Sequence, residues 1–435
     1  MTSNTRVVVI GAGLAGVRLA RRLGELGASA LLVGEEEHAP YNRVLLAEVL
    51  AGRYAPEVIA LPAPAGLLRT RVTGIDRAAR TVDCADGTSI AYDALVLATG
   101  SNPVLPPLRG LFADTHLAST HRAGGPTRFS GRGSGGCPPG RHSAADRQLP
   151  EGVHAFRTMD DCLGLAKAVR PGVRAVVIGG GLLGVSAARA LAVRGAQVVL
   201  AQQAERLMER QLDPDASRLV LRHLTDLGVE VHTECRVRDV RCVAGAVRSV
   251  ELADGYALDA DLVVLACGVR PRTGLAEQAG LAVHKGILVD DELRTSDPHI
   301  HAIGDCAQHD GTVYGLAAPA LEQADALAEL LAGDTGARYA GTRSLTRLTL
   351  TGPDSPFDLA AFGETEARPG DDVVRIADAT RGTYRKVVVR EDRLVGGVLV
   401  GELGTVGALA RAWEGAEPLP GDGPLLHLLT NDGGS

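Results

Sequence analysis

Short apolar runs alternate with glycine-rich turns and helical stretches along most of the chain, a pattern typical of strands joined by helices. The run Val7–Ile10 comes first and leads into the glycine-rich turn Gly11–Gly16. A helix is predicted to about Gly24, and a second apolar run follows over Ala28–Val33. Strand, helix and strand in this order predict a βαβ unit with two parallel strands.

The same plan returns 168 residues further on. It comprises the apolar run Ala175–Ile178, the turn Gly179–Gly184, a helix to about Arg194 and the run Gln197–Leu200. Two copies so far apart are too distant for a solenoid repeat and predict two nucleotide-binding domains. The predicted fold class is α/β, with two nested Rossmann-like domains and a small C-terminal α+β domain.

Composition changes between the two copies and again after them. Residues 111–150 are rich in Gly, Pro and Arg, most markedly from His121 to Pro150, and almost lack periodic apolar residues. Such a stretch buries too little surface to offset its ordering entropy, so we expect a mobile insertion there. Strand-like alternation in 340–425, with a hairpin turning at Glu391-Asp392, predicts the small α+β domain.

Composition also argues against several classes of function. Aromatic residues make up only 3% of the chain and the net charge is −7, which disfavours a surface that stacks bases and neutralises phosphates. No apolar run reaches the roughly 18 residues of a membrane span. The glycines after Val7–Ile10 favour a first strand over a signal peptide. Seven scattered cysteines without a C-x-x-C pair predict reduced thiols in a cytoplasmic protein.

Each glycine-rich turn follows a strand and opens a helix, the context in which G-x-G-x-x-G binds a dinucleotide. The first glycine permits the tight turn, the second lets a pyrophosphate approach the backbone, and the third allows close helix–strand packing. The N–H groups at the helix start then face the phosphates. The binding residues predicted in this way are Gly11, Gly13, Leu14, Ala15 and Gly16 in the first copy, and Gly179, Gly181, Leu182, Leu183 and Gly184 in the second.

An acid after the second strand of such a unit holds the adenosine ribose. In the first copy Glu35 and Glu36 are available. In the second copy the position falls on Gln202, which can accept a hydrogen bond but lacks the charge that rejects a 2′-phosphate. Arg206 is close enough in sequence to be a phosphate partner. The choice between NADH and NADPH therefore stays open.

Three further segments complete the pattern. Tyr92–Gly100 is an apolar strand ending in the turn Ala98-Thr99-Gly100, and Ala260–Gly268 repeats that shape. His301–Ala307 places an aspartate directly after a strand. With these segments the chain resembles the pyridine-nucleotide-dependent flavoprotein reductases, which include glutathione reductase, ferredoxin reductases and rubredoxin reductases.

Within that superfamily the chain is most similar to the flavoprotein module of NAD(P)H-dependent assimilatory nitrite reductases. The likeness runs from about residue 5 to 420, interrupted at 121–150. The segments that carry it are Pro40–Leu46, Val49–Gly52, Phe156–Asp161, Leu207–Asp213 and Tyr314–Pro319.

The resemblance implies FAD as a cofactor, with NADH or NADPH as the second. It divides the chain into an FAD domain over 1–110 and 271–335, an NAD(P)-type domain over 151–270, and a C-terminal domain that covers the flavin or forms an interface. It places Arg43 and Arg157 beside the flavin or its phosphates. The other FAD-binding residues it implies are Val72, Ala98, Thr99, Gly100, Gly304, Asp305 and Ala318.

By the same resemblance, a hydride passes from NAD(P)H to flavin N5 and its electrons pass to a second acceptor. No catalytic side chain is expected, because the flavin is the reactive centre. The acceptor would be a nitrite-reductase-type partner, ferredoxin, rubredoxin or a small molecule. Nucleic acid and membrane are not expected as partners, and an oligomeric state is compatible with this function.

The chain also departs from its relatives. No cysteine precedes Cys84, so dithiol chemistry beside the flavin is not expected, and no cysteine group could hold an iron–sulfur centre or haem. Nitrite reduction would therefore need a partner. Relatives often place a Glu in the helix after the second glycine turn, and many ferredoxin-reductase-like members pair it with a Lys near the flavin. In this chain the position of the Glu falls on Ser186, and that of the Lys falls near Glu48.

These departures leave two alternatives open. One is a flavin-dependent oxidase or oxygenase of a small metabolite with weakened or lost NAD(P)H use. The other is a redox-sensing protein that holds FAD without turnover.

A metal site is not expected. Four potential metal ligands lie near one another in the sequence, namely His299, His301, Cys306 and His309, but the family that the chain resembles uses this segment to bind the flavin.

Overall fold

The computed structural model describes residues 5–62, 66–112, 149–343, 345–351, 356–415, 418–419, 426 and 429–430. Of the insertion expected over 111–150, only residues 111–112 and 149–150 belong to this described part. Cys137 lies outside it. Within the described residues, no helix is both long enough and apolar enough to cross a membrane.

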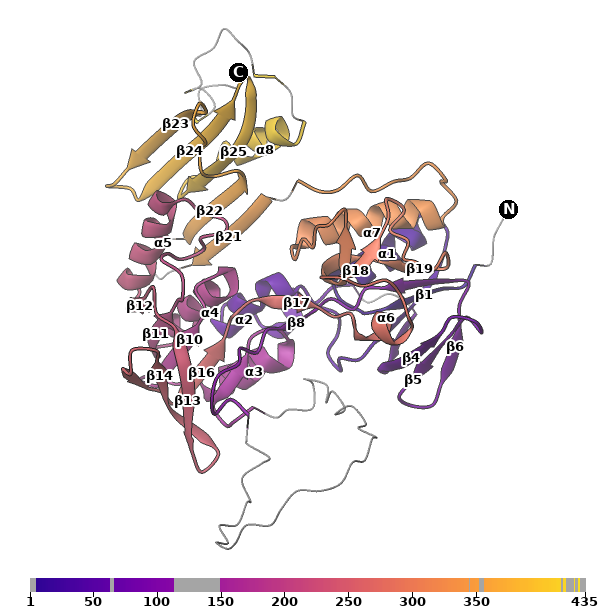
Figure 1. Ribbon diagram of the computed structural model, residues 1–435, viewed down its shortest axis with the longest axis horizontal. Helices are drawn as coiled ribbons and strands as arrows, with labels where there is room; N and C mark the ends of the chain where they lie inside the picture. The colour runs from indigo at the N-terminus through magenta and orange to yellow at the C-terminus, as the bar shows by residue number, and fades with distance from the viewer. Residues whose placement is uncertain are drawn as a thin grey trace, which may run out of the picture.

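The first βαβ unit lies at the centre of a parallel sheet with the strand order β19-β7-β1-β2-β3 (Figure 1). Helices α1 (Leu14–Glu25) and α7 (Ala317–Leu331) share a core with one face of the sheet, and a small antiparallel sheet shares a core with the other. The strands of the parallel sheet are β1 (Val7–Ile10), β2 (Ala30–Gly34), β3 (Leu67–Arg69), β7 (Ala94–Leu97) and β19 (Ile300–Ala302). The antiparallel strands are β4 (Val72–Asp76), β5 (Thr81–Cys84) and β6 (Ser89–Ala91).

The second βαβ unit builds another parallel sheet, in the order β12-β11-β10-β16-β9. Its strands are β9 (Val153–Ala155), β10 (Arg174–Ile178), β11 (Gln197–Ala201), β12 (Glu230–His232) and β16 (Leu262–Leu265). Its helices are α3 (Met159–Ala168), α4 (Leu182–Val193) and α5 (Pro214–Asp226). An antiparallel layer packs beside it, made of β13 (Val237–Val243), β14 (Ala246–Leu252) and β15 (Ala257–Asp259).

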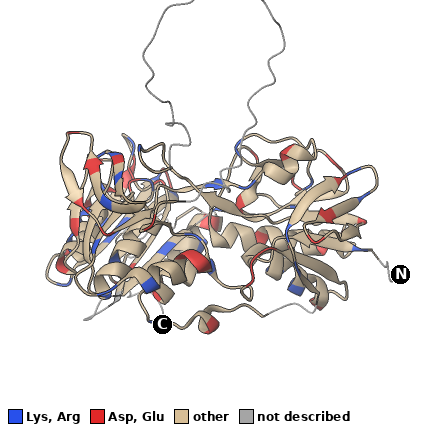
Figure 2. Cartoon of the chain, turned by 90° about the horizontal axis from the view of Figure 1, so that it is seen from below, with Lys and Arg blue, Asp and Glu red and all other residues tan. Residues whose placement is uncertain are grey.

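The chain crosses between the two sheets twice, once in each direction. Strand β8 (Ser101–Pro103) leads out of the first sheet, and β17 (Val269–Pro271) returns beside it as its antiparallel partner. The second unit is therefore inserted into the first. Figure 2 shows two separate lobes, and Figure 1 labels β8 and β17 where the chain passes between them. The nested α/β fold predicted from the paired glycine turns is confirmed.

The remaining short elements connect these layers. They are α2 (Leu46–Leu50), α6 (Gly274–Gln278), β18 (Ile287–Val289), β20 (Ala307–His309) and the short 3-10 helices η1 (Arg43–Leu45), η2 (Pro56–Ile59) and η4 (Gly304–Cys306).

The C-terminal region forms an antiparallel sheet in the order β21-β22-β25-β24-β23, with α8 (Val406–Gly415) on one face. The expected hairpin joins β24 to β25 and turns at Glu391, whose φ of 58° closes the tight connection. The strands are β21 (Leu345–Thr351), β22 (Pro356–Gly363), β23 (Asp372–Asp378), β24 (Thr383–Arg390) and β25 (Arg393–Val400).

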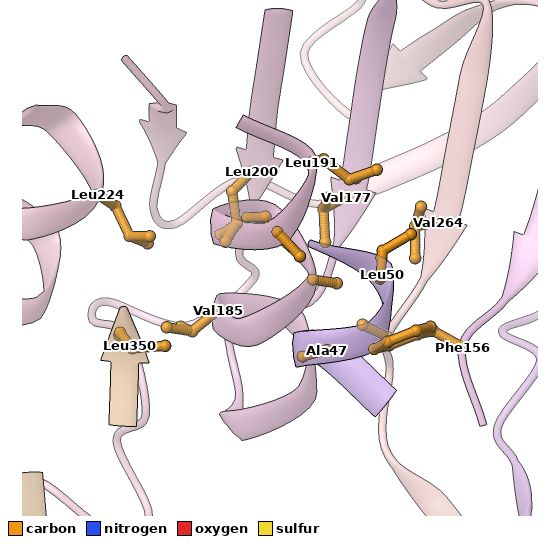
Figure 3. Close-up of a cluster of buried hydrophobic side chains, with 14 of the residues drawn as sticks. Ala47, Leu50, Phe156, Val177, Val185, Leu191, Leu200, Leu224, Val264 and Leu350 are labelled. Atoms are coloured by element: carbon orange, nitrogen blue, oxygen red, sulfur yellow. The ribbon is translucent and has the colours of Figure 1, made fainter. Parts of the chain in front are cut away.

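One hydrophobic core joins three parts of the chain (Figure 3). Leu50 of α2, Val185 of α4 and Leu350 of β21 belong to the same buried cluster. Helix α2 comes from the first nucleotide-binding unit, α4 from the second, and β21 from the C-terminal sheet. This core therefore fixes the second glycine turn relative to the first lobe and to the C-terminal sheet.

Candidate functional site

The first glycine turn has a backbone that no other residue type fits without strain. Gly11 has a φ of 118°, and a Cβ atom there would overlap the carbonyl oxygen of Ala98. A Cβ at Gly16 would overlap the carbonyl oxygen of Gly11. At Gly13, by contrast, no atom of the described residues lies within 4 Å of the Cβ position. The turn is closed on the protein side and open on the other, as a bound pyrophosphate requires.

The start of α1 suits an anion. Gly13 caps the helix without a side-chain hydrogen bond, and the first turn contains no acidic residue. N–H groups at such a helix start carry the positive end of the helix dipole. Leu14 and Ala15, predicted as phosphate contacts, stand at this end of the helix. The residues therefore fit the pyrophosphate of FAD.

The two acids after β2 have different roles. Glu36 is held by Arg43 and by Tyr41, whose hydroxyl donates to Glu36 Oε2 at 2.7 Å. Burial raises the pKa of Tyr41, which keeps the hydroxyl protonated as the donor. Glu35 pairs with the half-exposed Arg272 and with no other cation of the described residues, and such a surface contact exchanges easily with water or a ligand. Of the two, Glu35 is the better candidate for a ribose hydroxyl.

A partly buried charged cluster forms where three distant segments meet. Arg157 Nη2 lies 2.5 Å from Asp305 Oδ2, and the Ser101 hydroxyl donates to the same oxygen at 2.8 Å. Arg43 Nη1 donates to the carbonyl oxygen of Arg157 at 3.1 Å. Both side chains of the Arg157–Asp305 pair are only 17% exposed. The structure thus brings together the three charged residues that the resemblance places near the flavin.

This cluster retains an unused donor. Arg157 Nε is buried and has no hydrogen-bond partner among the described residues. A buried donor without a partner carries a desolvation cost that a polar ligand can remove. Asp305 directly follows Gly304, whose φ is 76° and whose N–H donates to Gln323 Oε1 at 2.7 Å. The donor set fits a flavin and its sugar chain.

The remaining predicted FAD contacts lie in the same lobe but differ in what they can offer. Ala98 and Thr99 adjoin Gly11 at the end of β7, and Thr99 Oγ1 donates to the carbonyl oxygen of Arg272 at 2.7 Å. Gly100 has a φ of 71°. Val72 is buried in β4, so it would contact a ligand through its backbone. Ala318 lies in the first turn of α7.

The second glycine turn repeats the geometry of the first. Gly179 has a φ of 110°, and a Cβ atom there would lie 2.5 Å from the carbonyl oxygen of Ala266. A Cβ at Gly184 would overlap the carbonyl oxygen of Gly179, whereas nothing lies within 4 Å of that position at Gly181. Leu182 and Leu183 open α4 without a side-chain cap or an acid in the first turn. This turn also fits a dinucleotide.

The residues expected to select the coenzyme are already engaged. Gln202 Oε1 accepts the Gly180 N–H at 2.7 Å, so its amide closes the turn. The Arg206 guanidinium pairs with Glu366 of the C-terminal region. Ser186 donates its hydroxyl to the Leu182 carbonyl oxygen at 2.8 Å, within its own helix. None of these contacts singles out NADH or NADPH.

The three histidines and the cysteine near Asp305 each contact a different partner. His299 contacts Arg80, the His301 ring contacts the carbonyl oxygen of Glu292, and His309 contacts Asp291. Cys306 donates towards the Leu97 carbonyl oxygen. In the part of the chain that the structure describes, no three potential ligands gather as a metal would require.

Sequence reasoning missed a buried cluster between α5 and the C-terminal sheet. Asp213 Oδ2 accepts from Lys386 Nζ at 2.8 Å and from the Tyr384 hydroxyl at 2.7 Å, while Oδ1 caps α5 by accepting the Ala216 N–H at 3.0 Å. The carboxylate is only 2% exposed. The cap was readable from the Asp213-Pro214 pair, but the lysine comes from 173 residues away.

Asp213→Asn is expected to destabilise the protein by roughly 3 kcal/mol, because it leaves Lys386 buried without a countercharge. Burial alone would raise the pKa of Asp213, but the hydrogen bonds from Lys386, the Ala216 N–H and Tyr384 outweigh it and lower the pKa below its ordinary value. The stabilisation is therefore present above about pH 4 and is lost as the pH falls through the lowered pKa.

Thermal unfolding of the FAD-loaded protein measured from pH 3 to pH 7 checks this. The Asp213→Asn variant should be less stable than the parent at pH 7, and the difference should shrink at the acidic end. Adding Lys386→Met should restore part of the loss, since no buried charge then remains unpaired. An Asp213→Asn variant as stable as the parent at pH 7 would contradict the role of the ion pair.

Known proteins share this architecture and sequence. Residues 5–324 match the family described as "Pyridine nucleotide-disulphide oxidoreductase", and residues 351–414 match "Rubredoxin NAD+ reductase C-terminal domain". The chain is 32% identical over 410 residues to the "Assimilatory nitrate reductase electron transfer subunit" of Bacillus subtilis strain 168, which covers 91% of the chain and 48% of that relative. Nitrite reductases of Bacillus subtilis and Klebsiella oxytoca align similarly, so the chain spans about half the length of these curated relatives or less.

Two further relatives match over a larger share of their own length. The "Probable ferredoxin reductase CtmF" of Castellaniella defragrans is 33% identical over 316 residues, which is 70% of this chain and 68% of that protein. The solved structure of the covalent putidaredoxin reductase–putidaredoxin complex superposes with a TM-score of 0.79 at 25% identity, covering 98% of this chain and 99% of that one.

Proposed function

Because the chain belongs to the pyridine nucleotide-disulphide oxidoreductase family, we propose that it takes electrons from NADH or NADPH and delivers them through FAD to a separate acceptor protein. The observation that carries the proposal is the pair of glycine turns, each closed by backbone on one side and open on the other. One turn lies beside the Arg157–Asp305 cluster and the other opens α4. Two dinucleotide sites in one chain are what electron transfer between two such cofactors requires.

Family membership confirms the superfamily expected from the sequence, together with FAD and a nicotinamide coenzyme as the cofactors. It also confirms the enzyme class, an FAD-dependent NAD(P)H oxidoreductase. When bound, FAD accepts a hydride and passes its electrons on, which is the chemistry that amino-acid side chains cannot supply.

We propose a small redox protein as the acceptor, of the ferredoxin or rubredoxin type or a nitrite-reductase-type partner. Support comes from the match of residues 351–414 to a rubredoxin reductase C-terminal domain and from the likeness to a probable ferredoxin reductase. The nitrate and nitrite reductase relatives are about twice as long as this chain or more, and their whole activity is therefore not carried over.

The residue roles form part of the proposal. The first turn and the start of α1 would hold the FAD pyrophosphate, Glu35 a ribose hydroxyl, and Asp305 the sugar chain of the flavin. Arg43 and Arg157 would orient the flavin side of the site. The second turn would hold the coenzyme pyrophosphate, with Gln202 keeping the turn closed.

The proposed division into domains follows the two crossings of the chain. The FAD domain would comprise the segment before β8 and the segment from the end of β17 to about residue 335, and the NAD(P) domain the segment between β8 and β17. The sheet β21–β25 would form the separate C-terminal domain. Leu105, Leu108 and Leu111 pack in the core of the second sheet. We therefore place the first change of domain at β8 rather than at residue 110.

The test is anaerobic stopped-flow absorbance of the FAD-loaded protein mixed with NADH or NADPH. Rapid bleaching of the oxidised flavin band with one coenzyme is expected, followed by reoxidation when ferredoxin or rubredoxin is added. No bleaching with either coenzyme, while dithionite still reduces the flavin, would contradict the proposal and favour a flavin-dependent oxidase. Reoxidation only by small oxidants would overturn the choice of a protein acceptor.

A further inference from the structure

A charged side chain lies in the middle of the most apolar helix of the second lobe. All residues from Gly184 to Leu191 of α4 are buried, and Arg189 among them is only 1% exposed. A guanidinium in such a place carries a large desolvation cost, and burial lowers the pKa of Arg189. Some interaction must compensate for that cost.

The compensation comes from two other parts of the chain. The Arg189 guanidinium forms an ion pair with Glu48 of α2, and its Nη1 donates to the carbonyl oxygen of Thr351 in β21 at 3.0 Å. Arg53, which follows α2, donates to the Thr351 hydroxyl and lies 3.8 Å from Glu48. One side chain of α4 thus ties together the helix after the Arg43 segment and the first strand of the C-terminal sheet.

The surroundings make this contact rigid. Leu50, Val185 and Leu350 of the shared core come from the same three elements (Figure 3). Arg189 Nε and Glu48 Oε2 are buried and have no hydrogen-bond partner in the described part of the chain. Both atoms are therefore closed to bulk solvent, and in such a low-dielectric site the attraction of the pair is stronger than that of a surface pair.

The pair joins the two helices that follow the cofactor-binding segments in the chain. Helix α4 begins at the second glycine turn, whereas α2 follows directly after Arg43, which contacts Arg157 next to Asp305. Ser186 stands one turn before Arg189 on the same side of α4, but its hydroxyl returns to the Leu182 carbonyl oxygen. Of these two polar side chains, Arg189 is the one that reaches α2.

We propose that Arg189 and Glu48 form a positioning pair that sets helix α4, and with it the nicotinamide coenzyme, against the flavin side of the first lobe. This inference rests on the proposed function, because it concerns the step in which the coenzyme reduces the flavin. Neither residue touches the reacting atoms. The pair fixes the distance and angle between two helices, and through Thr351 it holds the C-terminal sheet to the same point.

The test compares the rate of flavin reduction with coenzyme affinity in the FAD-loaded protein. The double variant Glu48→Gln with Arg189→Met removes both charges, so no buried charge is left unpaired and the fold is retained. Its limiting rate of flavin reduction is expected to fall by about tenfold or more, since small misplacements of reacting groups cost that much. Coenzyme affinity should stay within about threefold, because the second glycine turn is unchanged.

Arg194→Gln is the matched control. Arg194 caps the same helix and also reaches α2, donating to the carbonyl oxygens of Leu50 and Ala166 at 3.2 Å each. Among the described residues it pairs with no carboxylate. Its rate of flavin reduction should equal that of the parent protein. Arg189→Lys keeps the charge with a shorter reach and should give an intermediate rate.

The possible results distinguish a failure of the positioning role from a failure of the proposed function. If the parent protein is reduced rapidly and the double variant equally so, the positioning role is wrong. If the double variant loses FAD, the Arg189→Lys variant decides, and a parent-like rate there overturns the inference. If neither coenzyme reduces the flavin of the parent protein, the proposed function itself fails.

Discussion

Replacing Gly179 by alanine is expected to abolish efficient flavin reduction by NADH and by NADPH while FAD stays bound. Gly179 has a φ of 110°, and its Cβ position lies 2.5 Å from the carbonyl oxygen of Ala266. A non-glycine residue in such a conformation costs about 1–3 kcal/mol before any overlap is counted. With the overlap, coenzyme affinity should fall by about 100-fold or more.

Stopped-flow reduction at a series of coenzyme concentrations measures this effect, and the flavin absorbance of the purified protein reports FAD content. Gly164→Ala is the control, since Gly164 lies in α3 of the same lobe and a Cβ there meets only the His154 ring at an ordinary 3.7 Å. Rapid reduction of the Gly179→Ala variant at low coenzyme concentration would mean that the coenzyme does not use this turn.

The two glycine turns were predictable because their signal is local. Each turn combines a first glycine with a φ above 100°, at Gly11 and Gly179, with open space at the second glycine, at Gly13 and Gly181. The two glycines of each turn are only two residues apart in the chain. Glycine adopts that conformation without strain, so the spacing of glycines after an apolar strand predicts the backbone conformation of the turn. The strands and helices around them followed from the same local pattern.

The pairing of side chains across the fold was not predictable in the same way. The sequence offers Glu35 and Glu36 as equal candidates, and only the structure shows that Arg43 and Tyr41 already hold Glu36. Likewise, Arg206 is near the second turn in sequence, but its guanidinium pairs with Glu366, 160 residues away. Such pairings depend on the arrangement of whole elements, which no single stretch of sequence encodes.

The buried charges illustrate what a sequence can and cannot signal. Arg189 is the one charged residue of α4, which marks it as unusual, but nothing local indicates that its partner is Glu48, 141 residues earlier. Asp213 is recognisable as a helix cap, yet Lys386 belongs to a separate sheet. Both clusters tie the C-terminal sheet to the second lobe. We therefore expect that sheet and the second lobe to move together.

Gly11→Ala is expected to yield a protein that no longer retains FAD. The φ of Gly11 is 118°, and a Cβ atom there would overlap the carbonyl oxygen of Ala98, at the end of the neighbouring strand β7. To remove this overlap, either the glycine turn or the end of β7 must shift. Each of these two segments would line the pyrophosphate of FAD. Strain and overlap together should weaken FAD binding by about 100-fold or more, so most of the flavin is lost during purification.

The ratio of flavin to protein absorbance measures this loss, and circular dichroism checks that the fold survives. Gly24→Ala is the control, because Gly24 lies in α1 of the same lobe and nothing is found within 4 Å of its Cβ position. It should keep its full FAD content and gain slightly in helix stability. A Gly11→Ala variant that purifies with stoichiometric FAD would show that the first turn is not where the flavin cofactor is held. The comparison with Gly179→Ala then assigns the two turns, since one variant should lose the flavin and the other only its reduction by the coenzyme.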